Sequence, residues 1–454
     1  MSPALVGALA QRFGERCVVA DPERCARYAG DWSGLSPQTP ELVVRPETTE
    51  QAAELVAHLY QLGVPVTFRG AGTGKAGGCI PSPGSVVLST ERMNRAPLVR
   101  ADDLVVSCSA GTLAARLDEE AAAHGLFYPP DPNSLAISSI GGNVATNAGG
   151  PKAVKYGLTG HYLLGLTYVG AQGEVVRTGA DTIKSVAGTN LSGLLLGSEG
   201  TFGLITEVTM RLVARPQTVQ TALLTFESTA AAVQAVGALF RSGVMPRCAE
   251  LLDEISCDTI RNLEQHALPQ GCQAALILET DGTEDQSLDE LLTLTEAAQP
   301  LETMVAQTPS QRERIWAPRR DLSVALRDRR ALKVSEDIAV PRGQLATAVE
   351  RIREAASATP FEVATYGHAG DGNLHVNILF DREAQRAEVE ALQDHVFRIA
   401  IDLSGTITGE HGIGLAKRHA LPWEAGAARM ALEHRLKAVM DPKLLFNPGK
   451  VLGP

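Results

Sequence analysis

The stretch RGAGTGKAGGC, residues 69–79, holds five glycines in eleven residues, and glycine clusters of this kind often wrap a phosphate group. Three of its glycines have the G-x-G-x-x-G spacing of nicotinamide-binding folds, and its Gly-Lys pair resembles the end of a nucleotide-triphosphate loop. The dinucleotide fingerprint must open a helix, but Pro81 and Pro83 follow this stretch and block helical hydrogen bonds. The triphosphate loop needs a glycine where this chain has Arg69 and a hydroxyl where it has Ala76. The loop is therefore predicted to cradle a phosphate without a helix dipole.

Length and composition favour an ordinary soluble protein of two or three domains, since 454 residues exceed one hydrophobic core and 44% of them are apolar. The formal net charge of −11 argues against a nucleic acid or an anionic membrane as the partner. Seven cysteines without a C-x-x-C pair indicate neither a disulfide framework nor an iron–sulfur cluster. The N-terminus has no basic leader and no stretch reaches ~18 apolar residues, so we expect a cytoplasmic location without a membrane span.

The first half of the chain predicts a mixed domain of helices and strands. Short helices are expected at residues 3–13 and 22–29, each announced by a cap and a proline, Ser2-Pro3 and Asp21-Pro22. A β-α-β unit follows, with its second strand running into the glycine loop, at residues 41–46, 48–63 and 64–69. Further strands are predicted at residues 86–89, 103–108, 163–169 and 203–212, the last with Leu204, Val208 and Met210 inward and Glu207, Thr209 and Arg211 outward.

The second half predicts an antiparallel sheet backed by helices on one face. Strand and helix patterns alternate from residue 221 to 243, and strands recur at residues 273–280 and 333–341. Helices at residues 287–298, 343–358 and 382–404 complete the helical layer. No low-complexity linker separates the halves, so tight packing and a ligand-binding cleft between two domains are expected.

Two further glycine-rich blocks lie in the first half. PPDPNSLAISSIGGNVATNAGGPKAVKYG, residues 129–157, offers many backbone N–H groups and little side-chain bulk, which suits a chain lying along a pyrophosphate or a flavin ring. A long irregular surface loop explains this composition equally well. LLLGSEGTFGLITEV, residues 194–208, predicts a helix, a glycine turn and a strand.

Together, the three blocks resemble the flavin-binding domain of the vanillyl-alcohol oxidase and p-cresol methylhydroxylase family. The resemblance implies an α+β fold with a two-part FAD-binding domain, and it identifies the cradled phosphate as the FAD pyrophosphate. No histidine stands in or beside the loop, so noncovalent FAD is implied, while the role of Lys75 stays open. The cofactor-binding residues implied by the resemblance are Arg69, Gly70, Ala71, Gly72, Thr73, Gly74, Gly77, Gly78, Pro130, Asp131, Ser134, Gly141, Gly142, Asn143, Thr146, Asn147, Gly149, Gly150, Tyr156, Gly157, Glu199, Gly203, Ile205 and Asn447.

Metal-ligand residue types gather in YGHAGDGNLHVNI, residues 366–378, and TITGEHGIGLAKR, residues 406–418. His368 and His375 flank the turn AGDGN, and a β-hairpin would bring both imidazoles to face one point. Glu410 arrives on a glycine-bounded loop, and two histidines with one carboxylate leave open positions on a divalent ion for substrate. His411, beside it, can stay off the metal as a base. Histidines in purely structural roles are the alternative to this site.

These C-terminal blocks, with the terminal LKAVMDPKLLFNPGKVL, resemble the FAD-linked 2-hydroxyacid dehydrogenases: D-lactate dehydrogenase, the glycolate oxidase catalytic subunit and D-2-hydroxyglutarate dehydrogenase. The resemblance covers roughly residues 36–454 and implies His368, His375 and Glu410 as metal ligands, Zn foremost, with Mn or Fe also open. It further implies His411 as the catalytic base and Asn373 as a substrate contact. The domains implied are a helical appendage (1–35), the FAD-binding domain (36–214), a ferredoxin-like antiparallel-sheet domain for substrate and metal (215–440) and a segment returning to the flavin (441–454).

Arg319 resembles the family arginine that grips the substrate carboxylate through a bidentate fork. A solvated basic helix face is the alternative, because six more arginines surround it: Arg312, Arg314, Arg320, Arg327, Arg329 and Arg330.

The sequence thus predicts FAD-dependent oxidation of a D-2-hydroxy acid to the 2-keto acid, with metal-assisted deprotonation and hydride transfer to flavin N5. An external electron acceptor, such as a quinone, a cytochrome or an electron-transfer flavoprotein, is implied because the chain has no second redox centre of its own. Ser335 and Glu336 stand where the hydroxyglutarate enzymes tend to have a lysine with tyrosines, which favours D-lactate, glycolate or a similar acid over D-2-hydroxyglutarate, although Lys333 is close by. A metal-dependent hydrolase and a noncatalytic flavin-binding subunit of a glycolate oxidase-like complex are the alternatives from other classes. A homodimer is left open.

Overall fold

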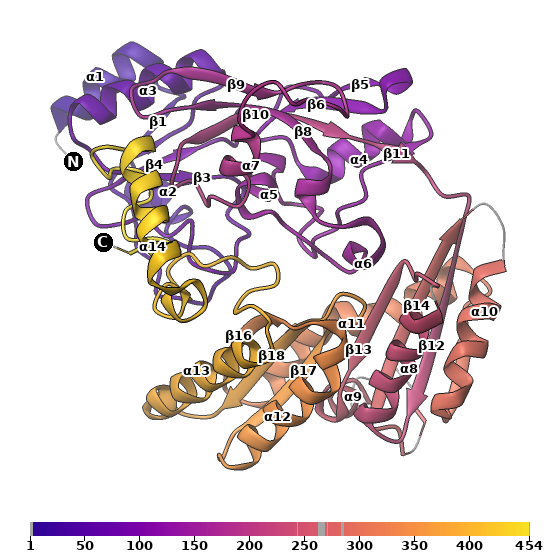
Figure 1. Ribbon diagram of the computed structural model, residues 1–454. Coiled ribbons are helices and arrows are strands. Elements are labelled where there is room, and N and C mark those ends of the chain that lie inside the picture. The colour runs from indigo at the N-terminus through magenta and orange to yellow at the C-terminus, as the bar shows by residue number, and fades with distance from the viewer. Residues whose placement is uncertain (1–2, 243, 262–267, 270, 283–285, 454) are drawn as a thin grey trace. The chain divides into compact units, whose positions relative to one another are not determined.

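The computed structural model shows a chain that packs as two units, Met1–Ala148 with Leu158–Arg215 and Glu410–Pro454, and Gly149–Gly157 with Pro216–Gly409 (Figure 1). The residues described are 3–242, 244–261, 268–269, 271–282 and 286–453, and the predicted cap Ser2 lies outside them. Within these ranges no helix combines the length and the apolar character that crossing a membrane requires.

A four-stranded sheet of order β1-β2-β4-β3 forms one part of the first unit, and β2, β4 and β3 run parallel. Its strands are β1 (Val18–Val19), β2 (Val43–Val44), β3 (Val66–Arg69) and β4 (Val86–Ser89). Helix α3 (Thr49–Gln61) connects β2 with β3, which confirms the predicted β-α-β unit. It begins where the Thr48 side chain accepts a hydrogen bond from Gln51 N, and it buries Leu55, Val56 and Leu59 along one face. Because β3 ends at Arg69, the glycine loop lies at a strand's carboxyl end, as predicted.

A five-stranded antiparallel sheet of order β5-β6-β10-β8-β9 forms the other part. Its strands are β5 (Leu98–Arg100), β6 (Val105–Ser109), β8 (Leu163–Val169), β9 (Val175–Gly179) and β10 (Leu204–Arg211), and a small pair joins β7 (Leu126–Phe127) to β11 (Val213–Ala214). The inward positions of β10 are confirmed as buried. Thr209, predicted outward, is also buried, because β10 is the central strand and the Thr209 hydroxyl shares a hydrogen bond of 3.1 Å with Ser107 Oγ.

Helices of 5 to 20 residues complete this unit. Helix α1 places Leu9, which is fully buried, in the core formed by α3, β3 and β4, so the N-terminal segment shares this core. Phe446, from the C-terminal segment, is fully buried in the same core and bridges to Val66 of β3. The helices of this unit are α1 (Pro3–Phe13), α2 (Pro22–Ala26), α3, α4 (Ala114–Ala122), α5 (Ile140–Thr146), α7 (Leu191–Leu195) and α14 (Leu421–Met440).

The second unit is built on a seven-stranded sheet of order β15-β12-β14-β13-β17-β18-β16, in which all neighbouring strands are antiparallel, as predicted. Its strands are β12 (Thr218–Phe226), β13 (Cys248–Leu252), β14 (Ala274–Gly282), β15 (Glu302–Val305), β16 (Leu332–Ala339), β17 (Glu362–His368) and β18 (Asn373–Phe380). The helices are α6 (Ala153–Tyr156), α8 (Thr229–Ser242), α9 (Glu254–Arg261), α10 (Gln286–Thr295), α11 (Pro309–Arg329), α12 (Leu345–Ser357) and α13 (Arg386–Asp402).

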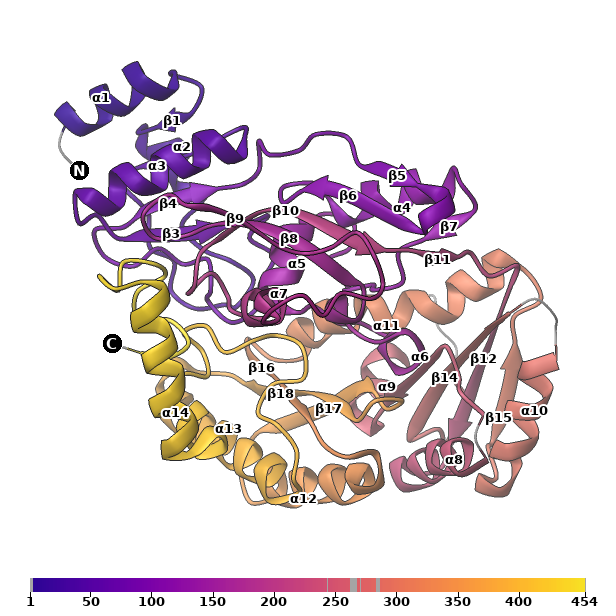
Figure 2. The same cartoon turned by 45° about the horizontal axis from the view of Figure 1, so that its top comes forward.

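Helices cover both faces of this sheet, so the prediction of a single helical layer was wrong. Ala275 and Ile277 of β14 pack in one cluster with residues of α9 and α11, while the alternate residues Leu276 and Leu278 are fully buried on the other side. Figure 2 shows α8, α12 and α13 on that other side of the sheet, with α11 opposite. A strand buried on both faces loses the alternating pattern that would have revealed the second layer.

Candidate functional site

The glycine loop after β3 runs without helix, as predicted, and packs directly on the start of α5. Ala71 N donates a hydrogen bond of 3.2 Å to Ser139 Oγ. A Cβ atom at Gly70 would lie 2.5 Å from the same oxygen, and Gly72 has a φ of 78°. Glycine is therefore required at Gly70 for close approach and at Gly72 for backbone conformation.

Arg69 and Gly78, at the two ends of this loop, are held by side chains of the first unit. The Arg69 guanidinium donates to Gly30 O at 2.7 Å and lies over the Tyr28 ring. Lys450 Nζ donates to Gly78 O at 2.8 Å, and burial lowers the pKa of Lys450 to about 8. Between these ends, the loop also contains Thr73, Gly74 and Gly77.

The second glycine block forms a buried helix over part of its length. Gly141 lies so close to Ala110 that a Cβ atom there would be 2.5 Å from the Ala110 Cβ atom. Thr146 Oγ1 donates to Gly142 O at 3.1 Å, and Asn147, with a φ of 51°, ends α5 in the left-handed region. The segment with Pro130, Asp131 and Ser134 has no regular structure and Pro130 is buried, so an irregular loop describes this segment but not α5.

Hydrogen bonds join the three predicted cofactor-binding blocks and the C-terminal segment within the first unit. Block one contacts block two through Ala71 and Ser139, and Glu199 N of block three donates to Ala145 O of block two at 2.8 Å. The Asn447 side chain accepts from Phe68 N at 2.8 Å and donates to Glu199 O. Gly203 and Ile205 follow Glu199 into the start of β10.

Glu199 is held by the loop that follows His411. Its carboxylate accepts from Ile413 N at 2.8 Å and from Gly414 N at 3.0 Å. Burial raises the pKa of Glu199 to about 7, although these two N–H groups oppose the rise.

Replacing Asn447 by alanine should lower both the stability of the first unit and its flavin content. Asn447 is 2% exposed, so the change leaves Phe68 N buried without its acceptor, at a cost of about 1–3 kcal/mol. Urea unfolding and the ratio of flavin absorbance to protein measure the two effects. An unchanged midpoint and full flavin content would contradict the role given to this side chain.

Four predicted cofactor-binding residues lie in the segment Gly149–Gly157, which packs with the second unit: Gly149, Gly150, Tyr156 and Gly157. Asp281 of β14 holds this segment, because its carboxylate accepts from the Tyr156 hydroxyl at 2.7 Å and from Lys155 Nζ. Val154 packs so closely on Gly370 that a Cβ atom at Gly370 would lie 2.8 Å from Val154 Cβ.

The two predicted metal-binding histidines lie at the hairpin of β17 and β18, as the AGDGN turn predicted. His368 ends β17, and His375 is the third residue of β18, paired with Tyr366. Both are buried, and their ring centroids are 5.2 Å apart with the planes nearly perpendicular. The two imidazoles therefore lie edge to face against each other.

Glu410 and His411 follow directly on Gly409, the last residue of the second unit. Ligand atoms of His368, His375 and Glu410 lie within 4.8 Å of one another, and so do those of Asp337, His375 and His411. Asp337 also accepts hydrogen bonds from Thr408 Oγ1 at 3.0 Å and from Gly409 N at 2.8 Å. These bonds hold the two residues that precede Glu410 in the chain.

The predicted substrate contacts are both buried in the second unit. Asn373 donates through Nδ2 to Asp337 and to Ile338 O, and within the described ranges its buried Oδ1 has no hydrogen-bond partner. Arg319 is 5% exposed, lies over the Tyr366 ring and points Nε and Nη2 at one oxygen of Glu250, each at 2.7 Å. A solvated basic face is therefore excluded for Arg319. The opposing charges of His368 and Arg319 outweigh burial and lower the pKa of Glu250 to about 2.

The residues present fit both of the groups that the resemblance implies. In the first unit, the buried Nδ2 of Asn143 and Oγ of Ser198 have no hydrogen-bond partner within the described ranges, and a bound ligand with acceptor oxygens would satisfy them. Gly70 and Gly141 leave no room for a side chain there. Two imidazoles with one carboxylate are a donor set that suits a divalent metal ion.

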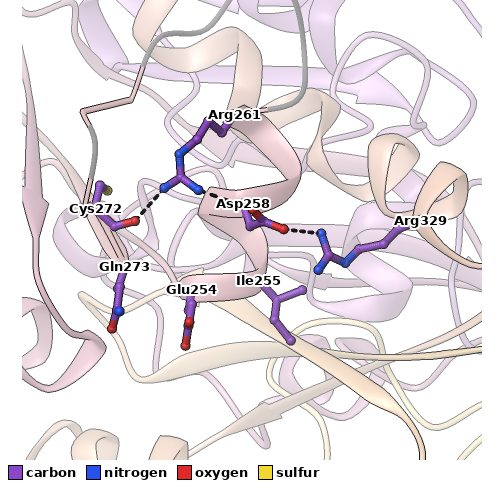
Figure 3. Close-up of a pocket in the computed structure, with 8 residues that line it drawn as sticks. Glu254, Ile255, Asp258, Arg261, Cys272, Gln273 and Arg329 are labelled. Atoms are coloured by element: carbon purple, nitrogen blue, oxygen red, sulfur yellow. Dashed lines mark hydrogen bonds and ion pairs between the residues drawn. The ribbon is translucent and has the colours of Figure 1, made fainter.

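One pocket lies away from all these residues (Figure 3). It has a volume of about 280 Å³ and is lined by Glu254, Ile255, Asp258, Arg261, Gly271, Cys272, Gln273 and Arg329. Both arginines are paired with Asp258, Arg261 at 3.3 Å and Arg329 at 2.6 Å. Among the described residues, this lining includes none of those predicted to bind flavin, metal or substrate.

Sequence patterns missed two residues of this region, Glu250 and Asp337. Glu250 stands in the otherwise apolar strand β13, CAELL, where an acid must find a buried partner. An acidic residue among apolar neighbours indicates a buried ion pair or hydrogen bond, but the sequence pattern does not identify the partner residue. Asp337 looked like one acid of a polar run, SED, and nothing in its spacing marked it as buried.

Comparison with known proteins bears on both units. A family model described as "FAD linked oxidases, C-terminal domain" matches residues 215–451, and one described as "FAD binding domain" matches residues 40–179. The chain is 34% identical over 429 residues to the glycolate oxidase subunit GlcD of Bacillus subtilis (strain 168), covering 93% of this chain and 91% of the relative. It is 33% identical over 426 residues to the D-lactate dehydrogenase of Anaerostipes hadrus, covering 91% and 89%.

Solved structures share the fold at low identity. p-Cresol methylhydroxylase with substrate bound matches with a TM-score of 0.80 at 14% identity, covering 99% of this chain and 97% of that one. Alkyldihydroxyacetonephosphate synthase matches with a TM-score of 0.77 at 19% identity, covering 99% and 85%.

Proposed function

Because the chain belongs to the family of FAD-linked oxidases and is an FAD-linked oxidoreductase, we propose that it oxidises a small D-2-hydroxy acid, such as D-lactate, or the achiral glycolate, to the 2-keto acid. The observation that carries the proposal is the group of two buried histidines, His368 and His375, with the partly buried Glu410, whose ligand atoms lie within 4.8 Å of one another. A purely flavin-binding subunit has no need of such a group.

The two cofactors are each assigned to residues described above. The glycine loop, α5, Glu199 and Asn447 would hold FAD, which would supply a hydride acceptor. His368, His375 and Glu410 would hold a divalent ion, which would supply a Lewis acid.

The chain's own residues then orient the substrate and remove its proton. His411 takes the proton of the 2-hydroxyl group, a role that requires its imidazole to be neutral. Asn373 Oδ1, a buried acceptor, contacts the substrate. Arg319 attracts the substrate carboxylate, and Glu250 fixes the plane of its guanidinium.

The structure supports a small substrate through the contacts of β16. Lys333, close in sequence to Ser335 and Glu336, donates to Ser323 O at 2.6 Å and to Ser323 Oγ at 2.8 Å. Ser335 is hydrogen-bonded to Asn377 Oδ1 at 2.7 Å, and Glu336 accepts from Gln393 at 2.6 Å. None of these contacts offers a second grip for a dicarboxylic acid.

The electron acceptor is a separate molecule in this proposal. Reduced flavin must be reoxidised, and neither metal-ligand group found among the described residues contains a cysteine, which leaves no sign of an iron–sulfur cluster there. A quinone, a cytochrome or an electron-transfer flavoprotein would serve.

D-lactate or glycolate should be oxidised with a kcat/KM at least about tenfold above that of D-2-hydroxyglutarate, because one missing charge partner costs roughly 1.4 kcal/mol or more. Steady-state assays with an artificial dye as acceptor measure the ratio, and L-lactate is the stereochemical control. A preference for D-2-hydroxyglutarate would contradict the substrate class, and equal rates with L-lactate would contradict the configuration.

A further inference from the structure

Glu250 lies in the middle of β13 and is fully buried. It stands directly opposite His368 in the antiparallel pair of β13 and β17. One carboxylate oxygen, Oε1, is hydrogen-bonded to His368 Nδ1. The other, Oε2, is 2.7 Å from both Nε and Nη2 of Arg319. One buried carboxylate thus joins a predicted metal ligand to the arginine predicted to hold the substrate.

The contact with Glu250 decides which nitrogen of His368 carries the proton. An ionised carboxylate only accepts hydrogen bonds, so Nδ1 must be the donor. The other ring nitrogen, Nε2, then keeps its lone pair, and a lone pair is what a metal ion requires. Glu250 therefore holds His368 in the tautomer and the ring orientation that can bind metal.

We propose that Glu250 is a positioning residue of the metal site, which fixes the tautomer of His368 through one oxygen and the guanidinium of Arg319 through the other. The proposal rests on the proposed function, since it needs a metal ion at His368. It goes beyond that function because Glu250 is neither a ligand nor a substrate contact there.

The chain contains a matched control for this carboxylate. Helix α11 lies along one face of the sheet (Figure 2). Its residues Arg312 and Arg319 are seven apart and so lie on the same side of the helix. Arg319 pairs with Glu250 on β13, and Arg312 pairs at 2.6 Å with Glu279 on the neighbouring strand β14. Glu279 is 1% exposed and also accepts from Trp316 Nε1 at 2.7 Å, but it contacts no predicted metal ligand.

Glutamine at either position keeps the shape of the side chain but turns one acceptor oxygen into a donor amide. In Glu250→Gln, the amide faces either Arg319, where two donors clash, or His368, where it favours the tautomer that cannot bind metal. In Glu279→Gln, the same mismatch affects partners that are not predicted metal ligands: Arg312, Arg247, Trp316, Thr221 and Cys248.

The test compares wild type, Glu250→Gln and Glu279→Gln as flavin-loaded proteins, with Zn²⁺ as the probe. Zn²⁺ affinity is measured by chelator competition, alongside the thermal midpoint and the flavin content. We expect Glu250→Gln to lower Zn²⁺ affinity about 10- to 100-fold, as loss of a group that orients a ligand does. Glu279→Gln should lower the thermal midpoint by a similar amount and leave Zn²⁺ affinity within about twofold of wild type.

Wild-type Zn²⁺ affinity in Glu250→Gln, or an equal loss of affinity in Glu279→Gln, would overturn the proposal for Glu250 and leave the proposed function standing. A wild-type protein that binds none of Zn²⁺, Mn²⁺ and Fe²⁺ would overturn the metal site itself, and Glu250's role with it. Should Glu250→Gln not fold, Glu250→Leu combined with Arg319→Leu removes both buried charges, and it should show the same 10- to 100-fold loss. Unchanged affinity in that double variant would also overturn the proposal.

Discussion

Replacing His368 by alanine should lower turnover by about a thousandfold or more and leave the protein yellow. His368 is 2% exposed at the end of β17, and its loss removes one of two imidazoles from the predicted ligand group. Losing Lewis-acid assistance worth about 4 kcal/mol corresponds to roughly three powers of ten in rate. Flavin should be retained, because the loop, α5 and Asn447 that are predicted to hold it belong to the first unit.

The measurements are dye-coupled turnover, bound metal per chain and flavin absorbance of the purified variant. His395→Ala is the control, since His395 is a histidine of α13 in the same unit that belongs to neither predicted ligand group. It should keep full turnover and full metal content. A His368→Ala protein that turns over normally would contradict the role of His368 in the metal site. A colourless one would contradict the assignment of flavin binding to the first unit.

Replacing Gly70 by valine should give a protein with about ten- to a hundredfold weaker affinity for FAD. A Cβ atom at this position would lie 2.5 Å from Ser139 Oγ and 3.4 Å from Gly142 Cα, so the loop must move away from α5. Forcing extra atoms into such a contact costs roughly 1–3 kcal/mol. If the loop binds the pyrophosphate, this cost weakens the binding of FAD.

Fluorescence titration of flavin-depleted protein with FAD measures the affinity. Gly30→Ala is the control, because a Cβ atom there would meet the nearest atom, Pro37 Cβ, at an ordinary 3.5 Å. The control should bind FAD like wild type. Wild-type affinity in Gly70→Val would mean that the glycine loop is not the cradle.

Local patterns were sufficient to predict several elements of the fold. The apolar spacing between residues 48 and 63 predicted helix α3, and the structure places that helix at Thr49–Gln61. The turn AGDGN, residues 369–373, predicted a hairpin because short turn residues separate two strand-like runs. The pairing of β17 with β18 confirms this hairpin.

The faces of the second sheet could not be predicted in the same way. β14 is apolar at consecutive positions, so its pattern does not say whether one or two helical layers cover it. Helix α11 carries arginines along its length, which made it look solvated. Its buried side in fact places Arg312 and Arg319 against Glu279 and Glu250, partners that are distant in sequence and visible only in the folded chain.

The candidate site likewise contains residues that local motifs point to and residues whose partners are distant in the sequence. Motifs singled out the glycine loop, the hairpin histidines and Glu410 as candidates, because each lies in or beside a turn with a recognisable composition. Glu250 and Asp337 act through hydrogen bonds across strands, and strand pairing between β13 and β17 is not encoded in local spacing.

The most direct test of the account is anaerobic reduction of the flavin by D-lactate and by glycolate in protein loaded with Zn²⁺ or Mn²⁺ and in protein stripped by a chelator. The account predicts that at least one of these acids bleaches the flavin absorbance of the metal-loaded protein. It also predicts that bleaching is slowed by about a thousandfold after stripping and is restored when the ion is returned. Absence of bleaching by any D-2-hydroxy acid in metal-loaded protein, or equal rates with and without metal, would contradict it.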